Sequence, residues 1–269
     1  MTRAILFGAT GRMGSAIVRA AVADQSLDVI AAIASPGSKS TGKDAGDVAG
    51  AGRLGVAVVD TLPSDLPRAQ VAIDFSRPEL SERALQACHA ARIPIVIGTT
   101  GHDADFAARV ADAAREIPVL VAPNTSIGVA VAQALVELAA RALPGSFDIE
   151  ISEAHHKHKL DAPSGTALAL AESASRGRGL EPRRAIVSGR TGQGARVDGQ
   201  IGISSIRAGD VVGSHTVWFA GAGERLTVTH EATDRGIFAR GAIRAATWLA
   251  SQKPGRYYMA NVLGLKTIS

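Results

Sequence analysis

The stretch Ala4-Ile-Leu-Phe7-Gly8-Ala9-Thr10-Gly11-Arg12-Met13-Gly14 decides the fold of the first half of this chain. Its first four residues form an apolar run that predicts a buried strand, and residues 15–22 predict a helix. The glycines between them permit a tight turn and let the backbone approach a phosphate at the helix N-terminus. A glycine turn in this context indicates dinucleotide binding, although the spacing is GxxGxxG rather than GxGxxG. An ordinary turn between a strand and a helix is the alternative.

Further apolar runs predict the other strands of a parallel sheet. They lie at residues 29–33, 56–59, 71–75, 93–97 and 118–121, and predicted helices precede the last two. This alternation predicts an α/β fold with a Rossmann-like doubly wound parallel sheet, whose ligands bind at the C-terminal ends of the strands. Small, polar or basic residues follow three of these strands, in Ser76-Arg77, Gly98-Thr99-Thr100-Gly101 and Ala122-Pro123-Asn124-Thr125. We therefore expect one shared cleft at this edge of the sheet.

The second half contains the densest group of chemically active residues, Glu153-Ala-His155-His156-Lys157-His158-Lys159-Leu-Asp161-Ala-Pro-Ser164-Gly165-Thr166. Alternating residues 147–152 predict a strand before it, and residues 166–172 predict a helix after it. A helix N-terminus beside a lysine attracts a carboxylate or a phosphate, and a histidine exchanges a proton near neutral pH. A solvated charged loop is the alternative. We expect no metal, because no cysteine or HExxH pattern accompanies the histidines and the two lysines repel a cation.

The rest of this half predicts a β-rich domain with a mixed open sheet. A helix at residues 128–142 leads into it, and apolar runs at 201–207, 211–220 and 225–230 predict strands. Residues 176–200 are rich in Gly and Arg, and residues 189–196 within them predict a mobile loop. The apolar segment 216–219 predicts a sheet face that needs cover from helices or from another subunit. A last helix is predicted at residues 236–249.

Composition limits the kinds of ligand and the cellular compartment that we expect for this chain. Of its 269 residues, 46% are hydrophobic and 4% aromatic, and the net charge is +4. The basic residues are dispersed and aromatic residues are few, which favours small anions over nucleic acid as ligands. The one cysteine, Cys88, excludes an internal disulfide, and no apolar run approaches the ~20 residues of a membrane span. Because a strand is predicted at once after Met1, leaving no room for a signal peptide, we expect a cytoplasmic protein.

Several of these motifs together resemble one enzyme family, the dihydrodipicolinate reductases, now named 4-hydroxy-tetrahydrodipicolinate reductases. The segments that carry the resemblance are 153–167, 8–14, 74–78, 98–101 and 207–210, in the family's order. The resemblance implies NAD(P)H-dependent reduction of 4-hydroxy-tetrahydrodipicolinate, a cyclic imine dicarboxylate, to tetrahydrodipicolinate in diaminopimelate and lysine biosynthesis. It also implies a dinucleotide-binding domain of residues 1–126 and 236–269. An inserted α+β domain of residues 127–235 would bind substrate, carry the catalytic groups and assemble a homotetramer.

The resemblance also implies roles for individual residues. His155 matches the family's proton donor and acceptor, and Lys159 matches its second proton donor. His156, Gly165 and Thr166 match contacts to the substrate carboxylates, whereas His158 is left a structural or electrostatic role. The implied cofactor-binding residues, for NADPH or NADH, are Gly8, Ala9, Thr10, Gly11, Arg12, Met13, Ala34, Ser35, Arg77, Gly98, Thr99, Thr100, Ala122, Pro123, Asn124 and Thr125.

Three other functions are alternatives to this one. A different nicotinamide reductase, such as a homoserine or aldehyde dehydrogenase, would need a catalytic cysteine or a different lysine context. A non-catalytic NAD(P)-binding regulatory protein is disfavoured by the presence of both His155 and Lys159. A basic nucleic-acid binder would show salt-dependent binding to DNA.

The end of the second predicted strand departs from the usual pattern. An acidic residue there normally holds the adenosine ribose, and many relatives carry one, but this chain reads Ala34-Ser35-Pro-Gly-Ser38-Lys39. The missing carboxylate removes the repulsion of a 2′-phosphate, and Ser35, Ser38, Lys39 and Arg12 could supply donors and positive charge. We therefore predict that NADPH is used at least as well as NADH.

Overall fold

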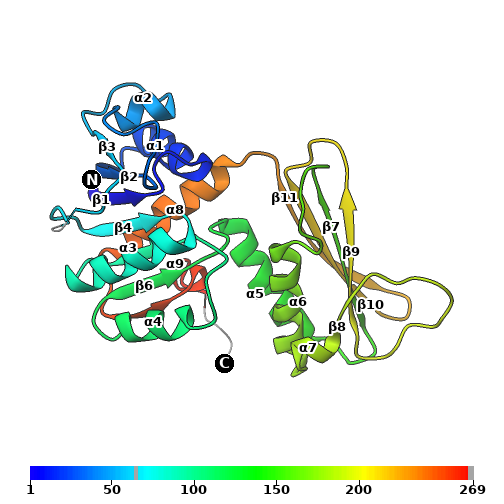
Figure 1. Cartoon of the computed structure of the whole chain (residues 1–269). Helices are drawn as coiled ribbons and strands as arrows, with labels where there is room; N and C mark the ends of the chain where they lie inside the picture. The colour runs from blue at the N-terminus through cyan, green and yellow to red at the C-terminus, as the bar shows by residue number, and fades with distance from the viewer. Residues whose placement is uncertain (64–65, 266–269) are drawn as a thin grey trace. The chain divides into compact units, whose positions relative to one another are not determined.

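The computed structural model describes residues 1–63 and 66–265, which divide into two compact units (Figure 1). Unit 1 comprises Met1–Ile127 and Gly236–Gly264, and unit 2 comprises Gly128–Arg235 and Leu265. Unit 1 is therefore discontinuous in sequence, with unit 2 inserted between its two segments. Within the described residues, every helix is too short or too polar to cross a membrane.

Unit 1 contains a parallel sheet in which strands alternate with helices. Its described strands are β1 (Thr2–Phe7), β2 (Leu27–Ile33), β3 (Val58–Val59), β4 (Val71–Asp74), β5 (Ile95–Ile97), β6 (Pro118–Val121) and β12 (Gly255–Tyr257). They lie in the order β12-β6-β5-β4-β1-β2-β3, and every pairing is parallel. This order reverses direction beside β1, so the predicted doubly wound sheet is confirmed. The C-terminal segment adds β12 next to β6.

Helices cover both faces of this sheet. They are α1 (Arg12–Asp24), α2 (Ala45–Ala49), α3 (Pro78–Ala90), α4 (Phe106–Ala113), α8 (Gly236–Leu249) and α9 (Met259–Val262). The helices α3 and α4 bury residues such as Leu85 and Val110 against Phe7 and Ile95 of the sheet. The helix α8 packs on β4, β5, β6 and α1. Because both faces are covered, the strands are apolar throughout rather than alternating.

Unit 2 contains a mixed sheet of a different kind. Its described strands are β7 (Asp148–His155), β8 (Ile186–Ser188), β9 (Ile201–Arg207), β10 (Gly213–Ala220) and β11 (Arg225–Ala232). They lie in the order β11-β10-β7-β9-β8, with β10 antiparallel to β7 and β11, and with β7, β9 and β8 parallel. The predicted mixed open sheet is therefore confirmed.

One face of this sheet carries the core of unit 2. Figure 1 shows α5 (Ile127–Ala142) and α6 (Gly165–Arg178) on that face, and α7 (Pro182–Ala185) follows α6. Val217 and Phe219 are fully buried on it, whereas Trp218 between them is 41% exposed on the opposite face. Helices therefore cover part of the predicted sheet face at 216–219: strand alternation buries Val217 and Phe219 under them and leaves Trp218 on the opposite face.

One predicted boundary is wrong, and two short elements were not predicted. We expected the strand before the histidine cluster to end at Ser152, but β7 continues to His155 because β9 and β10 pair with it along that length. The predicted loop at residues 189–196 lies outside the helices and strands, but the Gly- and Arg-rich segment before it contains α7 and β8. These are short elements held by tertiary pairing, which local sequence pattern signals weakly.

Candidate active site

The inward face of β7 changes from apolar to polar toward its C-terminal end. Ile149, Ile151, Glu153 and His155 alternate along the strand, so their side chains share one face, and all four are buried. Glu153 is 1% exposed and His155 is 9% exposed. A carboxylate this deeply buried requires hydrogen-bonding or charged partners.

Arg207, Ser164 and His155 are the partners of Glu153. Arg207 of β9 binds the Glu153 carboxylate through two contacts, Nη1 to Oε2 at 2.9 Å and Nη2 to Oε1 at 2.8 Å. The backbone N–H of Ser164 donates to Oε1 at 3.2 Å. The Nδ1 atom of His155 lies 2.6 Å from Oε2. One carboxylate is thus shared by a guanidinium, an imidazole and a backbone amide.

These contacts determine the charge of Glu153. Burial alone raises its pKa, but the hydrogen bonds from Arg207, Ser205 and His155 outweigh burial and lower the pKa to about 2. Glu153 is therefore ionised at neutral pH and accepts the proton on His155 Nδ1. The other ring nitrogen of His155, Nε2, is left to exchange a proton.

His215 of β10 lies on the other side of Glu153. It is 4% exposed, and burial together with the neighbouring His155 lowers its pKa to about 4, so the ring is neutral. Its Nε2 lies 3.1 Å from Ser164 Oγ, and its ring packs edge-to-face on His155 with centroids 5.0 Å apart. Ser164 Oγ also accepts a hydrogen bond from the Ala167 N–H at 3.2 Å, so it joins His215 to the first turn of α6.

The segment after β7 brings the remaining predicted residues to this end of the sheet. Ser164 is the N-cap of α6, and Gly165 and Thr166 are its first residues, as expected. Lys159 lies near enough that its charge helps to lower the pKa of His215, and its Nζ contacts both oxygens of Asp161 at 2.8 Å. His156 is half-buried, and burial followed by the charge of Arg235 lowers its pKa. His158 is exposed.

Glu153, His155 and His215 also form a group whose ligand-type atoms lie within 4.8 Å of one another. Both oxygens of Glu153 already bind Arg207, whose positive charge opposes a cation. The arrangement fits proton handling better than metal binding, and the prediction of no metal stays a prediction.

In unit 1 the predicted cofactor residues gather at one edge of the sheet. Their segments follow the C-terminal ends of β1, β2, β4, β5 and β6, which are adjacent in the sheet. Beneath them lies Asp74, fully buried, which accepts hydrogen bonds from Thr99 Oγ1 at 2.8 Å and from the Ser76 N–H at 3.1 Å. Burial raises the pKa of Asp74, and these donors oppose the rise. Asp74 therefore ties the loop after β4 to the loop after β5.

The glycine turn fits a dinucleotide. Gly8 has a φ of +75°, and a Cβ there would collide with the carbonyl oxygen of Phe75. A Cβ at Gly14 would collide with the backbone of Gly8 and Ala9, so α1 begins close against the turn. The N-cap of α1 is Gly11, which has no side chain to occupy the first helical N–H groups. The residues present can accept a pyrophosphate at this helix end.

The loop after β2 differs from the expectation in one respect. Ala34 is fully buried and Lys39 is exposed. A carboxylate nevertheless lies beside the loop, because Asp60 follows β3 and accepts a hydrogen bond from the Gly37 N–H at 3.1 Å. The sequence did not reveal this neighbour, because it depends on the pairing of β2 with β3.

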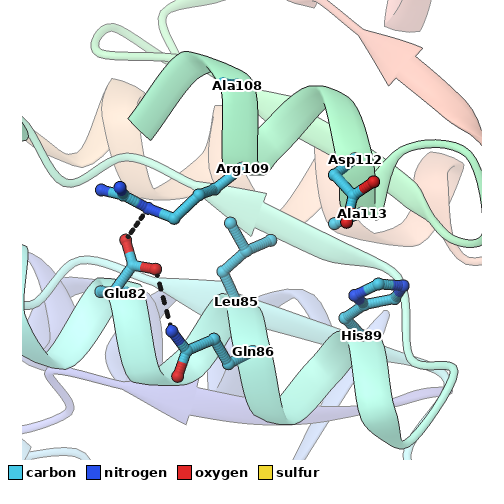
Figure 2. Close-up of a pocket in the computed structure, with 8 residues that line it drawn as sticks. All are labelled: Glu82, Leu85, Gln86, His89, Ala108, Arg109, Asp112 and Ala113. Carbon is cyan, nitrogen blue, oxygen red and sulfur yellow. Dashed lines mark hydrogen bonds and ion pairs between the residues drawn. The ribbon is translucent and has the colours of Figure 1, made fainter. Parts of the chain in front are cut away.

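A pocket of about 360 Å³ lies between α3 and α4 in unit 1 (Figure 2). Its charged side chains already pair, since Arg109 Nε binds Glu82 at 2.8 Å and Glu82 accepts from Gln86 at 3.1 Å. His89 at its rim contacts Glu116. None of the predicted site residues lines it, so we do not associate it with the reaction.

Four polar residues of the cluster were given no role from sequence: Glu153, Ser164, Arg207 and His215. Glu153 had a usable signal, because it lies two residues before His155 and shares its side of a strand. Arg207 and His215 are more than 50 residues from their partners in the chain and meet them only through strand register.

Two family descriptions match this chain over most of its length. "Dihydrodipicolinate reductase, N-terminus" matches residues 2–125, and "Dihydrodipicolinate reductase, C-terminus" matches residues 128–263. Among curated relatives, the 4-hydroxy-tetrahydrodipicolinate reductase of Anaeromyxobacter dehalogenans is 52% identical over 267 residues, covering 99% of each chain. That of Alkalilimnicola ehrlichii is 51% identical, covering 98% of this chain and 99% of the relative.

Solved structures of two other proteins are similar to the structure of this chain. The dipicolinate-bound dihydrodipicolinate reductase from Paenisporosarcina sp. TG-14 has a TM-score of 0.76 and 25% identity, covering 96% of this chain and 97% of that one. An amine dehydrogenase from Mycobacterium smegmatis has a TM-score of 0.59 at 12% identity, covering 95% and 94%, which shows a shared fold alone.

Proposed function

Because the chain belongs to the dihydrodipicolinate reductase family, we propose that the polar cluster at the end of β7 is the place where its substrate is protonated. The chain is an NAD(P)H-dependent 4-hydroxy-tetrahydrodipicolinate reductase of diaminopimelate and lysine biosynthesis. The relatives compared above are reductases, which favours catalysis over a non-catalytic regulatory role.

His155 is the proton-exchanging residue in this proposal. Loss of the 4-hydroxyl group as water would give a conjugated ring. NAD(P)H would supply a hydride to one carbon of that ring, and the adjacent atom would then take a proton. A positioned general acid accelerates such a step by ~10²–10⁴-fold. The single observation that carries the assignment is the 2.6 Å contact of His155 Nδ1 with Glu153, which leaves Nε2 for the substrate.

The dicarboxylate binds at the start of α6. Gly165 and Thr166 offer backbone N–H groups at a helix N-terminus, and Lys159 and His156 lie in the preceding segment. The related structure that carries dipicolinate, a planar dicarboxylate, supports a site for two carboxylates. Lys159 also serves as the second proton donor.

The cofactor binds at the edge of unit 1 formed by the ends of β1, β2, β4, β5 and β6. The backbone of residues 8–13 holds the pyrophosphate, and Ala34 and Ser35 lie where the adenosine ribose binds. Residues 98–100 and 122–125 line the rest, with Arg77 as a further contact. The close packing around Gly8 and Gly14 supports this assignment.

Steady-state oxidation of NAD(P)H by freshly generated substrate tests the proposal. His155→Gln should lower kcat by at least a hundredfold with little change in KM, because it removes a group that acts in the transition state. Lys159→Ala should lower kcat and raise KM, because a cation facing a carboxylate is lost. His158→Gln, at an exposed neighbouring position, is the matched control. Near-normal rates in both site variants would refute the assignment.

We further propose a cytoplasmic homotetramer assembled through unit 2. Within the described residues, α5 and α6 cover one face of its sheet, while Trp218 and Ile206 are 41% and 53% exposed on the other. A second sheet could cover those residues. Light scattering at micromolar concentration should give about four times the 27.6 kDa of one chain, and a 27.6 kDa particle would contradict the proposal.

A further inference from the structure

We propose that Glu153 and Arg207 are positioning residues that hold a proton on Nδ1 of His155 and jointly set how readily its Nε2 exchanges a proton. This inference rests on the proposed catalytic role of His155. It adds that proton exchange at His155 depends on two opposite charges, that of Glu153 on β7 and that of Arg207 on β9.

The geometry leaves the Glu153 carboxylate no freedom to turn. Its Oε2 is shared by His155 Nδ1 at 2.6 Å and Arg207 Nη1 at 2.9 Å. Its Oε1 is shared by Arg207 Nη2 at 2.8 Å and the Ser164 N–H at 3.2 Å. The side chain of Glu153 is fully buried, so solvent cannot replace any of these partners. An ionised carboxylate fixed in this way accepts the Nδ1 proton whether His155 is neutral or charged.

Arg207 is itself held in place from both sides. Its Nη1 donates to the Ile206 carbonyl at 2.7 Å, and its Nη2 donates to the Asp161 carbonyl at 2.5 Å. The guanidinium therefore joins β9 to the segment that carries Lys159. Its side chain is 19% exposed, so its charge acts on the cluster with limited screening.

The two charges act on His155 in opposite directions. The Glu153 carboxylate stabilises the imidazolium form, and the Arg207 guanidinium destabilises it. The other ionisable groups around the ring are His215 on β10 and His156, Lys159 and Asp161 in the following segment. His215 is neutral, and Lys159 and Asp161 pair with each other. Glu153 contacts His155 directly and Arg207 contacts Glu153, so deletion of these two charges tests the proposal.

A charge-deletion cycle separates this role from a purely structural one. The variants are Glu153→Gln, Arg207→Gln and the double variant, each in the full-length enzyme with saturating NADPH. The measurements are the pH dependence of kcat and the titration of the ring nitrogens of His155 by ¹⁵N NMR of histidine-labelled protein. The His155 signal is assigned by its loss in His155→Gln.

Opposite shifts are expected. Glu153→Gln should move the His155 titration and the alkaline fall of kcat about one pH unit or more to lower pH, because the stabilising charge is lost. Arg207→Gln should move both to higher pH, and the double variant should lie between them. In wild type the proton of neutral His155 should reside on Nδ1. Shifts of the same sign in both single variants, or a proton on Nε2 in neutral wild-type His155, would overturn the proposal.

Two further comparisons guard against ambiguous outcomes. If Glu153→Gln does not fold, Arg207→Gln is compared with Arg207→Lys, which keeps the charge and should keep the wild-type titration; a shift in Arg207→Lys as large as that in Arg207→Gln overturns the proposal. If the NMR titration moves as expected but the kcat profile does not, the positioning role is supported and the catalytic role of His155 fails. The two failures are therefore distinguishable.

Discussion

His155 at the end of β7 lies directly opposite Arg207 on the parallel strand β9. The same register places Glu153 opposite Ser205 on β9 and opposite His215 on β10. A slip of one residue in either pairing would turn the partner side chain to the other face of the sheet. The register of three strands thus fixes the geometry of the cluster, and the apolar residues Ile149 and Ile151 on the same face of β7 secure that register.

We expect Asp161 to compete with substrate for Lys159. Its two oxygens lie 2.8 Å from Lys159 Nζ, where a substrate carboxylate would bind. Exposed ion pairs are worth ~0.2–1 kcal/mol, so Asp161→Asn should tighten dipicolinate binding by about 1.4-fold to fivefold. Calorimetric titration of the purified enzyme measures this. Asp198→Asn, an exposed position with the same change of charge, should leave the Kd unchanged. Weaker binding by Asp161→Asn would show that Asp161 orients Lys159 instead.

Gly213 leaves room beside Nε2 of His155, the nitrogen that we propose exchanges a proton with the substrate. A Cβ at this position would lie 3.1 Å from Nε2 and 3.4 Å from Cδ2. Gly213→Ala should therefore lower kcat/KM by at least tenfold, because a methyl group would stand against the atom that must meet the substrate. Thermal unfolding should change little, since residue 213 is extended at the start of β10. Ser214→Ala, on the other face of the strand, is the control, and a fully active Gly213→Ala would exclude this route to Nε2.

Much of the fold could be predicted from sequence, because long apolar runs and glycine turns are local signals. The family resemblance is confirmed, and the predicted strands at residues 118–121 and 201–207 match β6 and β9 in both bounds. The missed elements, such as β8 and β12, have three residues each and depend on pairing with distant strands. Their sequences alone carry too few residues to show a period.

The site residues were harder to predict from sequence than the fold, because several of them meet only through strand pairing. The predicted residues fall in contiguous motifs, whereas Arg207 and His215 reach Glu153 and Ser164 from strands more than 50 residues away. Glu153 could have been found by extending the alternation of Ile149 and Ile151 by one more step. No local pattern could have placed Asp60 beside Gly37.

The neutral state of His215 predicts a pH dependence of stability. Its pKa is lowered from 6.5 to about 4 in the folded protein by burial, so between these values the unfolded chain binds more protons. The stabilisation is complete above pH 6.5 and is lost as the pH falls toward 4. Between pH 7.5 and 5 this one group should cost about 2 kcal/mol of unfolding free energy.

His215→Gln should remove that part of the pH dependence, because glutamine can form a hydrogen bond with Ser164 without titrating. Urea unfolding at the two pH values, compared between variant and wild type, gives the difference. His158→Gln, at an exposed histidine, should retain the wild-type dependence. An unchanged pH dependence in His215→Gln would show that the pKa of His215 is the same in the folded and the unfolded protein, which would contradict the prediction.

Cofactor preference depends on the loop after β2. Ala34 offers no carboxylate to the ribose diol of NADH, and Arg12 and Lys39 are exposed cations near the ends of β1 and β2. Asp60 is the opposing charge, but its carboxylate already accepts the Gly37 N–H. A charge-assisted hydrogen bond to a 2′-phosphate is worth ~1.5–3 kcal/mol, which corresponds to about one to two decades in affinity. One such contact would therefore outweigh a half-exposed carboxylate.

We accordingly expect kcat/KM for NADPH to equal or exceed that for NADH when both are measured at one fixed substrate concentration. Ala34→Glu should shift the ratio toward NADH, because the new carboxylate binds the ribose diol and repels the phosphate. Asp60→Asn should shift it toward NADPH, because a negative charge beside the loop is removed. Asp24→Asn, an exposed acidic position at the far end of α1, should leave the ratio unchanged. A tenfold preference of the wild-type enzyme for NADH would refute the prediction, since the positive charges of the loop would then have no effect on the 2′-phosphate.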